Sequence, residues 1–594
     1  MEQIESRICK NCRNQFGVDS DDVVFYKKIQ VPLPTFCPEC RLQRRIAWRN
    51  ERILYRRTCD ATGKDILAIY PPEKKLIVYD QKYWWSDAWD PISFGRDYDF
   101  LRPFFAQFAE LMQQTPQISV FNANAVNSEY CNYTVNQKNC YLVSAAWDSE
   151  ETMYSNRILL AKDSSDLYVC PKNESCYENV SCKNSYRLMF SALCNECTDS
   201  AFLYNCRNCQ SCFGCVNLRH KSYCIGNVQY TKAEYEKRLS EIGPWSVSNI
   251  AAARRKLEEL KSSAIRRYAE IYKCTNVVGD NVEQSKNCYW CFDLAGNAEN
   301  AKWAHWGSYG LKDSYDVGPG SGGNSELVYE GVSSGVNNAR LKFTVTVWNS
   351  HDVEYSVNCH GCNNCFGCVS LKNAQYCVFN KQYTKEEYEQ LVEKIKAQMA
   401  QVQYVDKRGI AYGYGEFFPS ELSTFAYNES VAQEYFPMRR DEAVAAGYLW
   451  HDPAERSYNI TKPSEELPET IKEVTDDIMK ETIGCAHNGT CHDGCVAAFR
   501  ITPQELLFYR KFNLPLPRLC FNCRHYSRLQ QRNPMKLWHR ACTCAGTQSE
   551  NNIYKNTAAH FHGAGHCPNE FETSYAPDRP EIVYCEQCYN GEVV

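Results

Sequence analysis

The chain contains 594 residues, with 66 Lys and Arg against 71 Asp and Glu and a formal net charge of −5. A chain of this length is expected to form about three to five domains with substantial hydrophobic cores. The balanced charge excludes a globally basic nucleic-acid coat, and no apolar stretch approaches the roughly 18–20 residues of a membrane-spanning helix. Because the first residues also lack an apolar segment, the sequence predicts a cytoplasmic protein with reduced thiols.

Cysteine is the unusual component of the chain, at 35 residues. The number is odd, and many of these residues fall in C-x2-C pairs. Disulfide frameworks are typical of short secreted chains, whereas such pairs in a long chain favour metal binding. The composition therefore indicates metal centres rather than disulfides.

Two C-x2-C pairs about 25 residues apart mark residues 1–90 as a zinc-ribbon or treble-clef module. The predicted ligands are Cys9, Cys12, Cys37 and Cys40. Each pair directs two thiolates to one ion, and four sulfur ligands complete a closed tetrahedron. A closed site of this kind indicates a structural Zn²⁺ ion.

An arginine-rich stretch, RLQRRIAWRNERILYRR, follows the fourth cysteine. Its arginines recur every three or four residues, which predicts one stripe on a helix. The stripe contains Arg41, Arg45, Arg49, Arg52 and Arg56. Guanidinium groups bind phosphate bidentately, so the stripe is a candidate interface for RNA, DNA or the ribosome. Pairing with acidic residues of the protein itself is the alternative interpretation.

The middle of the chain carries a repeat of about 10–15 residues, in which Asn, Asp, Ser or Cys precedes an aromatic or apolar residue. Short runs of this kind without a helical period predict two β-solenoid-like segments, at 127–230 and 274–383. The other expected parts are a linker with a short helix at 91–126, helical arms at 231–273 and 384–402, and a connector at 403–484. We expect the first arm to stay helical through residue 272, and the connector to contain a helix near 468–483.

The two repeat segments are copies of each other at an offset of 153, and each contains four cysteines spaced three residues apart. These runs are Cys206, Cys209, Cys212 and Cys215 in the first copy and Cys359, Cys362, Cys365 and Cys368 in the second. Three interpretations stand: an interior stack of small apolar residues, one Zn²⁺ ion per run, or an iron–sulfur cluster.

Residues 485–594 repeat the N-terminal module at a constant offset of 483, without a gap from Phe499 to Cys542. The predicted ligands of the first site are Cys491, Cys495, Cys520 and Cys523, with Cys485, His487 and His492 as nearby substitutes. The basic stripe returns as Arg524, Arg528, Arg532 and Arg540, together with Lys536. A match of this length indicates an internal duplication.

A second site follows in the C-terminal module, and here the copies diverge. Its predicted ligands are Cys542, Cys567, Cys585 and Cys588, with Cys544 as a competitor of Cys542. The corresponding N-terminal residues are Cys59, Thr62, Asp80 and Tyr83, so we expect that copy to have lost its second metal. An insertion carries His560, His562 and His566. An open catalytic zinc site is one interpretation of them, and a polar insertion with at most one spare ligand is the better supported one.

The end modules, with the pattern C-x2-C-x3-F, then F-Y, then P-x-P-x2-C-x2-C-R, resemble the bacterial "probable zinc ribbon" module. The order of parts, with WWSDAWDP after the first ribbon and a closing YAPDRPEIVYCEQCY, resembles a group of uncharacterised cysteine-rich proteins of candidate-phyla bacteria. The resemblance covers essentially the whole chain. It implies zinc ligands at the cysteines named above and carries no known activity.

No P-loop, dinucleotide fingerprint, nucleophile elbow or H-E-x-x-H motif occurs in the sequence, which favours a protein without catalytic activity. The leading hypothesis is a zinc-stabilised scaffold or binding protein whose basic helices contact nucleic acid or the ribosome. The alternatives are an iron–sulfur or metal-handling electron-transfer protein, and a structural protein that self-associates into homo-oligomers. We expect three zinc ions and no iron, or five zinc ions if both central cysteine runs bind metal.

Overall fold

The computed structural model describes residues 3–158, 161–162, 174–243, 245–307, 309–452, 458–491 and 494–594. The structure is β-rich and divides into two compact units, each assembled from separate stretches of the chain. Unit 1 contains residues 1–121, 269–452 and 535–537, and unit 2 contains residues 122–268, 453–534 and 538–594. The N-terminal cysteine module therefore shares a unit with the second repeat segment, and the C-terminal module shares one with the first.

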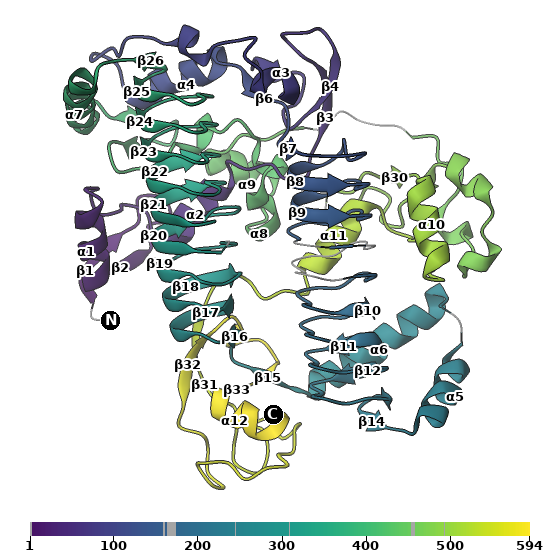
Figure 1. The fold of residues 1–594 in the computed structure, drawn as a ribbon. Helices are drawn as coiled ribbons and strands as arrows, with labels where there is room; N and C mark the ends of the chain where they lie inside the picture. Colours follow the sequence, from purple (N-terminus) through teal and green to yellow (C-terminus); the bar gives the residue numbers. More distant parts are fainter. Residues whose placement is uncertain are drawn as a thin grey trace. The chain divides into compact units, whose positions relative to one another are not determined.

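The repeat segment of unit 1 forms a column of stacked strands, drawn in teal in Figure 1 and called ladder 2 below. Its strands follow chain order, and every neighbouring pair except β25–β26 is parallel. The strands are β16 Ile271–Tyr272, β17 Thr275–Glu283, β18 Lys286–Leu294, β19 Glu299–Lys302, β20 Leu311–Val317, β21 Ser325–Val332, β22 Ala339–Val345, β23 His351–Glu354, β24 Asn363–Phe366, β25 Gln375–Val378 and β26 Lys381–Gln382. Each strand is too short to bury its own face, so it depends on its neighbours in the stack.

The repeat segment of unit 2, ladder 1 below, follows the same pattern. Its strands are β7 Asn122–Ala123, β8 Asn132–Lys138, β9 Ser144–Glu150, β10 Tyr186–Met189, β11 Thr198–Tyr204, β12 Phe213–Val216, β13 Cys224–Ile225 and β14 Val228–Gln229. Paired residues lie twelve positions apart, as between Ala201 and Phe213. Parts of the predicted segment, at 159–160 and 163–173, lie outside the described residues.

A three-residue rule underlies this twelve-residue repeat. In ladder 1 Asn205, Asn208 and Ser211 all have φ near +50°, and the residue after each faces the interior. Asn tolerates the left-handed region better than most residues because its short polar side chain bonds locally. Asn side chains also bond to the equivalent residue of the next repeat, as Asn124 Nδ2 does to Asn136 Oδ1 at 3.0 Å. The frequent Asn residues of the sequence therefore mark the corners of the repeat.

Helices follow both ladders. They are α5 Lys232–Ile242 and α6 Val247–Ser263 after ladder 1, and α7 Lys385–Gln401 after ladder 2. The helices α5 and α7 both begin with a capping box, formed by Thr231 with Glu234 and by Thr384 with Glu387. The helix α7 coincides with the predicted second arm. The first arm ends earlier than expected, because residues after Ser263 enter β15 Ile265–Arg267, which pairs with β33 Ile582–Tyr584.

The N-terminal module and the linker after it belong to unit 1. Their elements are β1 Gln3–Ile8, β2 Gln15–Asp19, α1 Ser20–Lys28, α2 Pro38–Ile46, β3 Tyr55–Thr58, β4 Asp65–Ala68, β5 Val78–Tyr79, α3 Gln81–Trp85, η1 Pro91–Phe94, α4 Phe104–Gln114 and β6 Gln117–Ile118. The helix α1 packs on ladder 2, where the Phe25 ring stacks on Tyr315 at 3.8 Å between centroids. The linker helix predicted within 91–126 is α4.

The connector is built from short elements. In unit 1 these are β27 Tyr404–Val405, β28 Ala411–Tyr412, η2 Ser420–Leu422, η3 Tyr427–Glu429, α8 Val431–Tyr435 and α9 Arg440–Ala445, and in unit 2 they are η4 Ser464–Glu466, η5 Ile471–Glu473 and η6 Asp476–Lys480. The helix predicted near 468–483 is therefore wrong. The β-branched pair Val474-Thr475 separates two single turns, and each turn buries one isoleucine in the core shared with Phe508.

The C-terminal module, apart from residues 535–537, lies in unit 2 and repeats the plan of the first. Its elements are β29 Ile483–Gly484, β30 Ala498–Phe499, α10 Pro503–Lys511, α11 Phe521–Leu529, β31 Trp538–Ala541, β32 Glu570–Thr573, β33 and α12 Glu586–Val593. The helix α10 packs on ladder 1, with Phe508 against Tyr177 at 5.8 Å between ring centroids. Among the described residues, no helix combines the length and the apolar character that crossing a membrane requires.

Candidate metal centres

The first candidate centre lies at the start of α2 in unit 1. The thiol sulfurs of Cys9, Cys12, Cys37 and Cys40 all lie within 4.8 Å of one another, and all four are free thiols. The Cys37 amide donates to Cys9 Sγ at 3.3 Å, and Asn11 Nδ2 donates to Cys40 Sγ at 3.2 Å. Cys37 is the N-cap of α2, where the helix dipole favours a thiolate. The structure thus brings together the four predicted ligands in a group that can hold a metal ion.

The proximity of these thiols splits their pKa values. Hydrogen bonds with Cys37 and Cys40 hold the pKa of Cys9 well below its ordinary value, whereas bonds with Cys37 and Cys9 raise the pKa of Cys40. Adjacent thiolates repel one another, so all four ionise together only when a cation lies among them. The group therefore has the electrostatic character of a metal site.

The second candidate centre lies in unit 2 and differs from the prediction by one ligand. Its four sulfurs belong to Cys485, Cys495, Cys520 and Cys523, so Cys485 stands where Cys491 was expected. The Cys520 amide donates to Cys485 Sγ at 3.3 Å, the bond that Cys37 makes to Cys9. The residues between Cys485 and Cys495 are an insertion into the first C-x2-C pair, which is why the constant offset missed the match.

The pairing of two short strands identifies Cys485 as the counterpart of Cys9. In the N-terminal module Arg7 pairs with Phe16, two residues before the first ligand. In the C-terminal module Ile483 pairs with Phe499, also two residues before the first ligand. Cys491 lies instead with His487 and Cys523 in a group of three potential ligands, which shares Cys523 with the four-thiol group. His492 lies outside the described residues.

The third candidate centre lies at the start of α12. The sulfurs of Cys542, Cys567, Cys585 and Cys588 lie within 4.8 Å of one another, and all four residues are buried. Cys585 is the N-cap of α12, and its amide donates to Cys542 Sγ at 3.2 Å. Cys542 rather than Cys544 belongs to this group. The four predicted ligands therefore lie together, and Cys544 belongs to a neighbouring group of potential ligands.

The N-terminal counterpart of this centre has the same backbone contact but different side chains. The Asp80 amide donates to Cys59 Sγ at 3.2 Å, as Cys585 does to Cys542. The Asp80 carboxylate then caps α3, accepting the amide of Lys82 at 3.0 Å. A capping carboxylate thus takes the position of a metal-binding thiolate, and both place negative charge at a helix N-terminus.

The central cysteine runs lie inside the ladders. The Cys206 thiol contacts the carbonyl oxygens of Tyr204 and Cys215, both at 3.6 Å, and Cys359 repeats this pattern in ladder 2. Cysteines three residues apart occupy successive inward positions of one repeat. Their thiols therefore contact different backbone carbonyl oxygens and do not converge on one metal position. Within the described part of the chain, none of the eight thiols falls in a group of potential metal ligands. The interior-stack interpretation fits this geometry, and the zinc and iron–sulfur interpretations of these runs do not.

The arginines of the predicted stripe are not free to bind phosphate at its first positions, because these side chains are buried. Its first members, Arg41 and Arg45, are at most 1 % exposed and pair with Asp316 of β20 at 2.9 and 2.8 Å. Arg44 joins them by pairing with Glu330 of β21 at 2.9 Å. Burial raises the pKa of Asp316, but the two guanidinium groups outweigh it and hold the pKa below its ordinary value. The alternative interpretation, pairing with the protein's own acidic residues, describes these side chains.

The remaining stripe residues are also not arranged as predicted. The helix α2 ends at Ile46, so the later arginines do not continue its face. Arg49, Arg524 and Arg528 are buried, Arg52, Arg532 and Arg540 are half-buried, and Arg56 is exposed. Arg524 lies over the ring of Tyr154 in ladder 1 at 4.8 Å. The arginines therefore do not form one continuous stripe in either module: α2 turns Arg41 and Arg45 toward ladder 2, and α11 turns Arg524 toward ladder 1.

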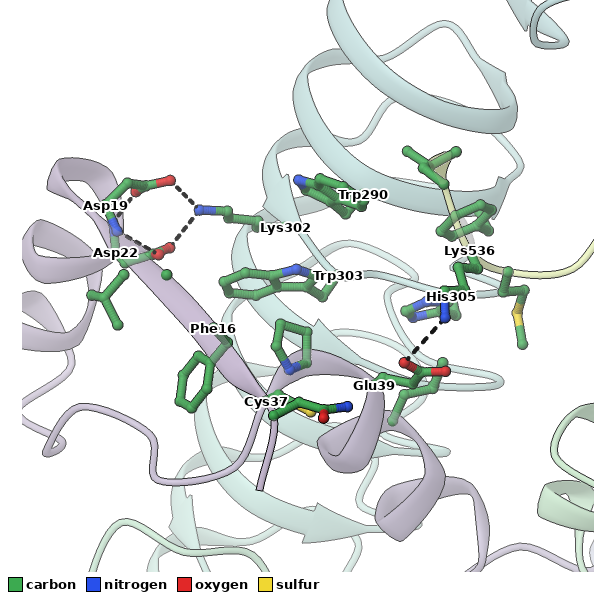
Figure 2. A pocket seen from close by; sticks show the side chains of 18 of the residues that line it. Phe16, Asp19, Asp22, Cys37, Glu39, Trp290, Lys302, Trp303, His305 and Lys536 are labelled. Atoms are coloured by element: carbon green, nitrogen blue, oxygen red, sulfur yellow. Dashed lines mark hydrogen bonds and ion pairs between the residues drawn. The ribbon is translucent and has the colours of Figure 1, made fainter. Parts of the chain in front are cut away.

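Unit 1 also contains a pocket of about 470 Å³ beside the first centre (Figure 2). Trp290 and Trp303 line it, and Lys302 of β19 donates to Asp19 and Asp22 at 2.6 Å each. His305 is buried, and burial together with the nearby Arg45 lowers its pKa to about 3, so the ring is neutral. The acidic and basic side chains that line this pocket are thus paired with one another: Lys302 with Asp19 and Asp22, and Lys536 with Glu39.

No family model matches the sequence, and no curated protein matches it either. The zinc-ribbon resemblance of the end modules therefore rests on their cysteine motifs.

Proposed function

We propose that this protein is a non-catalytic scaffold in which zinc ions fix two ribbon modules against two β-solenoid ladders. Three four-thiol groups supply the centres, one in unit 1 and two in unit 2. Four thiolates around one ion leave no open coordination position, and zinc is the ion that such closed sites bind. The proposal assigns the metal a structural role.

The observation that carries the proposal is the link from the first centre to the buried ion pairs of unit 1. Cys37 caps the same short helix that carries Arg41 and Arg45 into contact with Asp316. A metal ion at the thiols fixes the start of this helix, and the start of the helix sets where the guanidinium groups lie. Breaking a buried ion pair costs about 3–5 kcal/mol, so the position of the helix decides the stability of the unit.

The burial of these arginines does not favour nucleic acid, the partner predicted for the stripe. A nucleic-acid contact through the ribbon helices requires free guanidinium groups, and Arg41, Arg45, Arg524 and Arg528 are buried. We therefore base the scaffold on contacts within the protein, and not on RNA, DNA or the ribosome as a partner of this stripe. Electron transfer through the central cysteine runs is set aside because their thiols bond to backbone carbonyls.

The experiment is metal analysis of the full chain, followed by thermal unfolding with and without a strong chelator. We expect zinc without iron, and a large loss of stability on chelation, because structural zinc contributes about 10–16 kcal/mol of apparent binding free energy at pH 7. The variant Cys37→Ser should lose one equivalent of zinc. The matched control is Cys59→Ser, which removes a buried thiol that has no partner thiol at its site and should keep the full zinc content.

Two outcomes would overturn the proposal. One is unfolding that is unaffected by complete removal of zinc. The other is iron in the purified protein with a visible absorbance band, which would return the central runs to an electron-transfer role.

A further inference from the structure

A second set of ligands lies next to the third centre. The side chains of Cys544, His560, His562 and Cys588 place their ligand atoms within 4.8 Å of one another. Cys588 belongs both to this set and to the four-thiol group at the start of α12. Two sets of four ligands therefore meet at one buried sulfur.

The ring of His562 is oriented as a metal ligand would be. Its Nε2 lies 3.3 Å from Cys588 Sγ, and its Nδ1 lies 2.9 Å from the Gly565 carbonyl oxygen. A carbonyl oxygen only accepts hydrogen bonds, so Nδ1 carries the proton and Nε2 presents its lone pair toward the sulfur. Metal-binding histidines characteristically use their second ring nitrogen in this way.

His560 shows the mirror arrangement. Its Nε2 lies 3.0 Å from Glu592 Oε1, and both side chains are at most 2 % exposed. Glu592 is held in turn by the backbone amides of Thr557 and Ala558, both at 3.0 Å to Oε1. With Nε2 bonded to the carboxylate, Nδ1 is the ligand atom that remains. A carboxylate that orients an imidazole is a typical outer partner of a protein-bound metal.

Cys544 completes the set. Its side chain is buried, and Asn556 Nδ2 donates to its sulfur at 3.2 Å. An amide donor of this kind stabilises a thiolate. The loop that carries Cys544 is fixed by its carbonyl, which accepts the Cys567 amide at 2.9 Å. The position of this sulfur is therefore tied to the four-thiol group beside it.

We propose that this set binds a second zinc ion and that Cys588 bridges the two ions. The first ion would have Cys542, Cys567, Cys585 and Cys588 as ligands, and the second would have Cys544, His560, His562 and Cys588. Sulfur and imidazole nitrogen are the ligands that four-coordinate zinc prefers. The two ions form one binuclear centre with no open position.

The charge balance favours the pair over a single ion. One Zn²⁺ ion with four thiolates leaves a net charge of −2 in a buried site, whereas two ions with five thiolates and two neutral imidazoles leave −1. Burying excess charge is unfavourable, so the second ion reduces the desolvation penalty of the first.

The sequence supports the same assignment. The offset between the modules rises from 483 to 505 across the segment that contains Cys544, His560 and His562. The insertion thus supplies three of the four ligands of the second ion, and the N-terminal module, which lacks the insertion, lacks them all. The proposal therefore assigns the insertion more ligands than the single spare one expected from the sequence.

The test is the zinc content of the full chain, measured together with that of the double variant His560→Ala/His562→Ala. We expect four zinc ions per chain in the unsubstituted protein and three in the double variant. The control is His566→Ala, whose exposed ring pairs with Glu550 outside the set and should leave four. The variant His562→Cys replaces the imidazole with another zinc ligand, so it should keep four zinc ions. This result would show that the double variant loses zinc because it lacks ligands and not because it misfolds.

Substitution of the full chain with ¹¹³Cd²⁺ tests the bridge. Two ions that share the Cys588 sulfur should give two resonances with mutual scalar coupling, and the double variant should lose one resonance and the coupling. A zinc content of three that the double variant leaves unchanged would overturn the second ion but leave the scaffold proposal intact. Absence of zinc from all the four-thiol groups would instead overturn the scaffold proposal itself.

Discussion

The two end modules have the same backbone at their second sites but fill it differently. In both, a sulfur accepts the amide of the residue that caps the next helix, at 3.2 Å, with Asp80 as the cap in one module and Cys585 in the other. Both helices also reach the ladder of their own unit: Trp84 lies beside His360, and the Tyr589 hydroxyl oxygen accepts a hydrogen bond from Asn205 Nδ2 at 2.6 Å. At the start of the helix, the Asp80 carboxylate in one module thus takes the place that the Cys585 thiolate takes in the other, so this loop can form around a capping side chain without a set of metal ligands.

The substitution Cys588→Ser should have the largest effect, because it removes the one sulfur that belongs to both ligand sets. We expect two zinc equivalents to be lost, with unfolding of the C-terminal module detected by limited proteolysis. The matched variant in the other module is Tyr83→Ala, at the position that corresponds to Cys588, and it should leave the zinc content unchanged. Loss of a single equivalent from Cys588→Ser would contradict a shared sulfur.

The substitution Asp316→Asn should have the next largest effect. It leaves Arg41 and Arg45 buried without the carboxylate that pairs with both of them, so unit 1 should lose about 3–5 kcal/mol of its free energy of unfolding. Chemical denaturation followed by tryptophan fluorescence measures the change. The control is Asp352→Asn, which breaks an exposed pair with Arg340 and should cost less than about 1 kcal/mol. Equal effects of the two variants would contradict the scaffold role of the helix.

Unit 1 should also show a pH dependence that comes from His360. The ring packs beside Trp84 and Trp85, and burial lowers its pKa from the ordinary 6.5 to about 3. Because the unfolded state binds the proton first, the contribution of this group is complete above pH 6.5 and falls as the pH drops from 6.5 toward 3. His360 should contribute a slope of about 1.4 kcal/mol per pH unit. His305, whose pKa burial also lowers to about 3, should add a similar slope that remains when His360 is replaced.

The variant His360→Phe tests this slope. Its free energy of unfolding, measured by denaturation between pH 5 and 7, should vary less with pH than that of the unsubstituted protein. Zinc content should be followed in the same samples, so that acid release of metal from the thiol groups is separated from titration of the ring. A slope that His360→Phe leaves unchanged would show that His360 is not its source.

The sequence predicted what is local and missed what depends on distant partners. Cys9, Cys12, Cys37 and Cys40 were identifiable because each pair forms one tight turn whose spacing is fixed by the metal. Cys485 was not, because an insertion hides it from any constant offset. The burial of Arg41 depends on Asp316, which lies 275 positions away, and no helical periodicity reports that distance.

The ladders show the same limit in another form. The Asn, Ser and aromatic residues predicted short repeated strands. The three-residue rule that turns Cys206 and Cys209 inward is visible only from the positive φ angles of Asn205 and Asn208. The sequence shows the histidines of the C-terminal insertion only as a linear motif, without the groups that orient their rings. Their arrangement around Cys588 depends on the Glu592 carboxylate, which lies outside the motif and bonds to His560, and on the Gly565 carbonyl oxygen, which fixes the His562 ring.

The smallest effect is expected from Cys209→Ala in ladder 1. The Cys209 thiol is 1 % exposed and contacts the carbonyl oxygen of Arg207 at 3.3 Å, so its loss removes a small buried side chain and one weak hydrogen bond. We expect a loss of about 1 kcal/mol and no change in zinc content, measured by denaturation and metal analysis. The contrasting variant is Cys520→Ser, which should remove one zinc equivalent from the same unit. Together they separate the cysteines that fill an interior from those that hold an ion, because the two kinds differ in metal content even where they are equally buried.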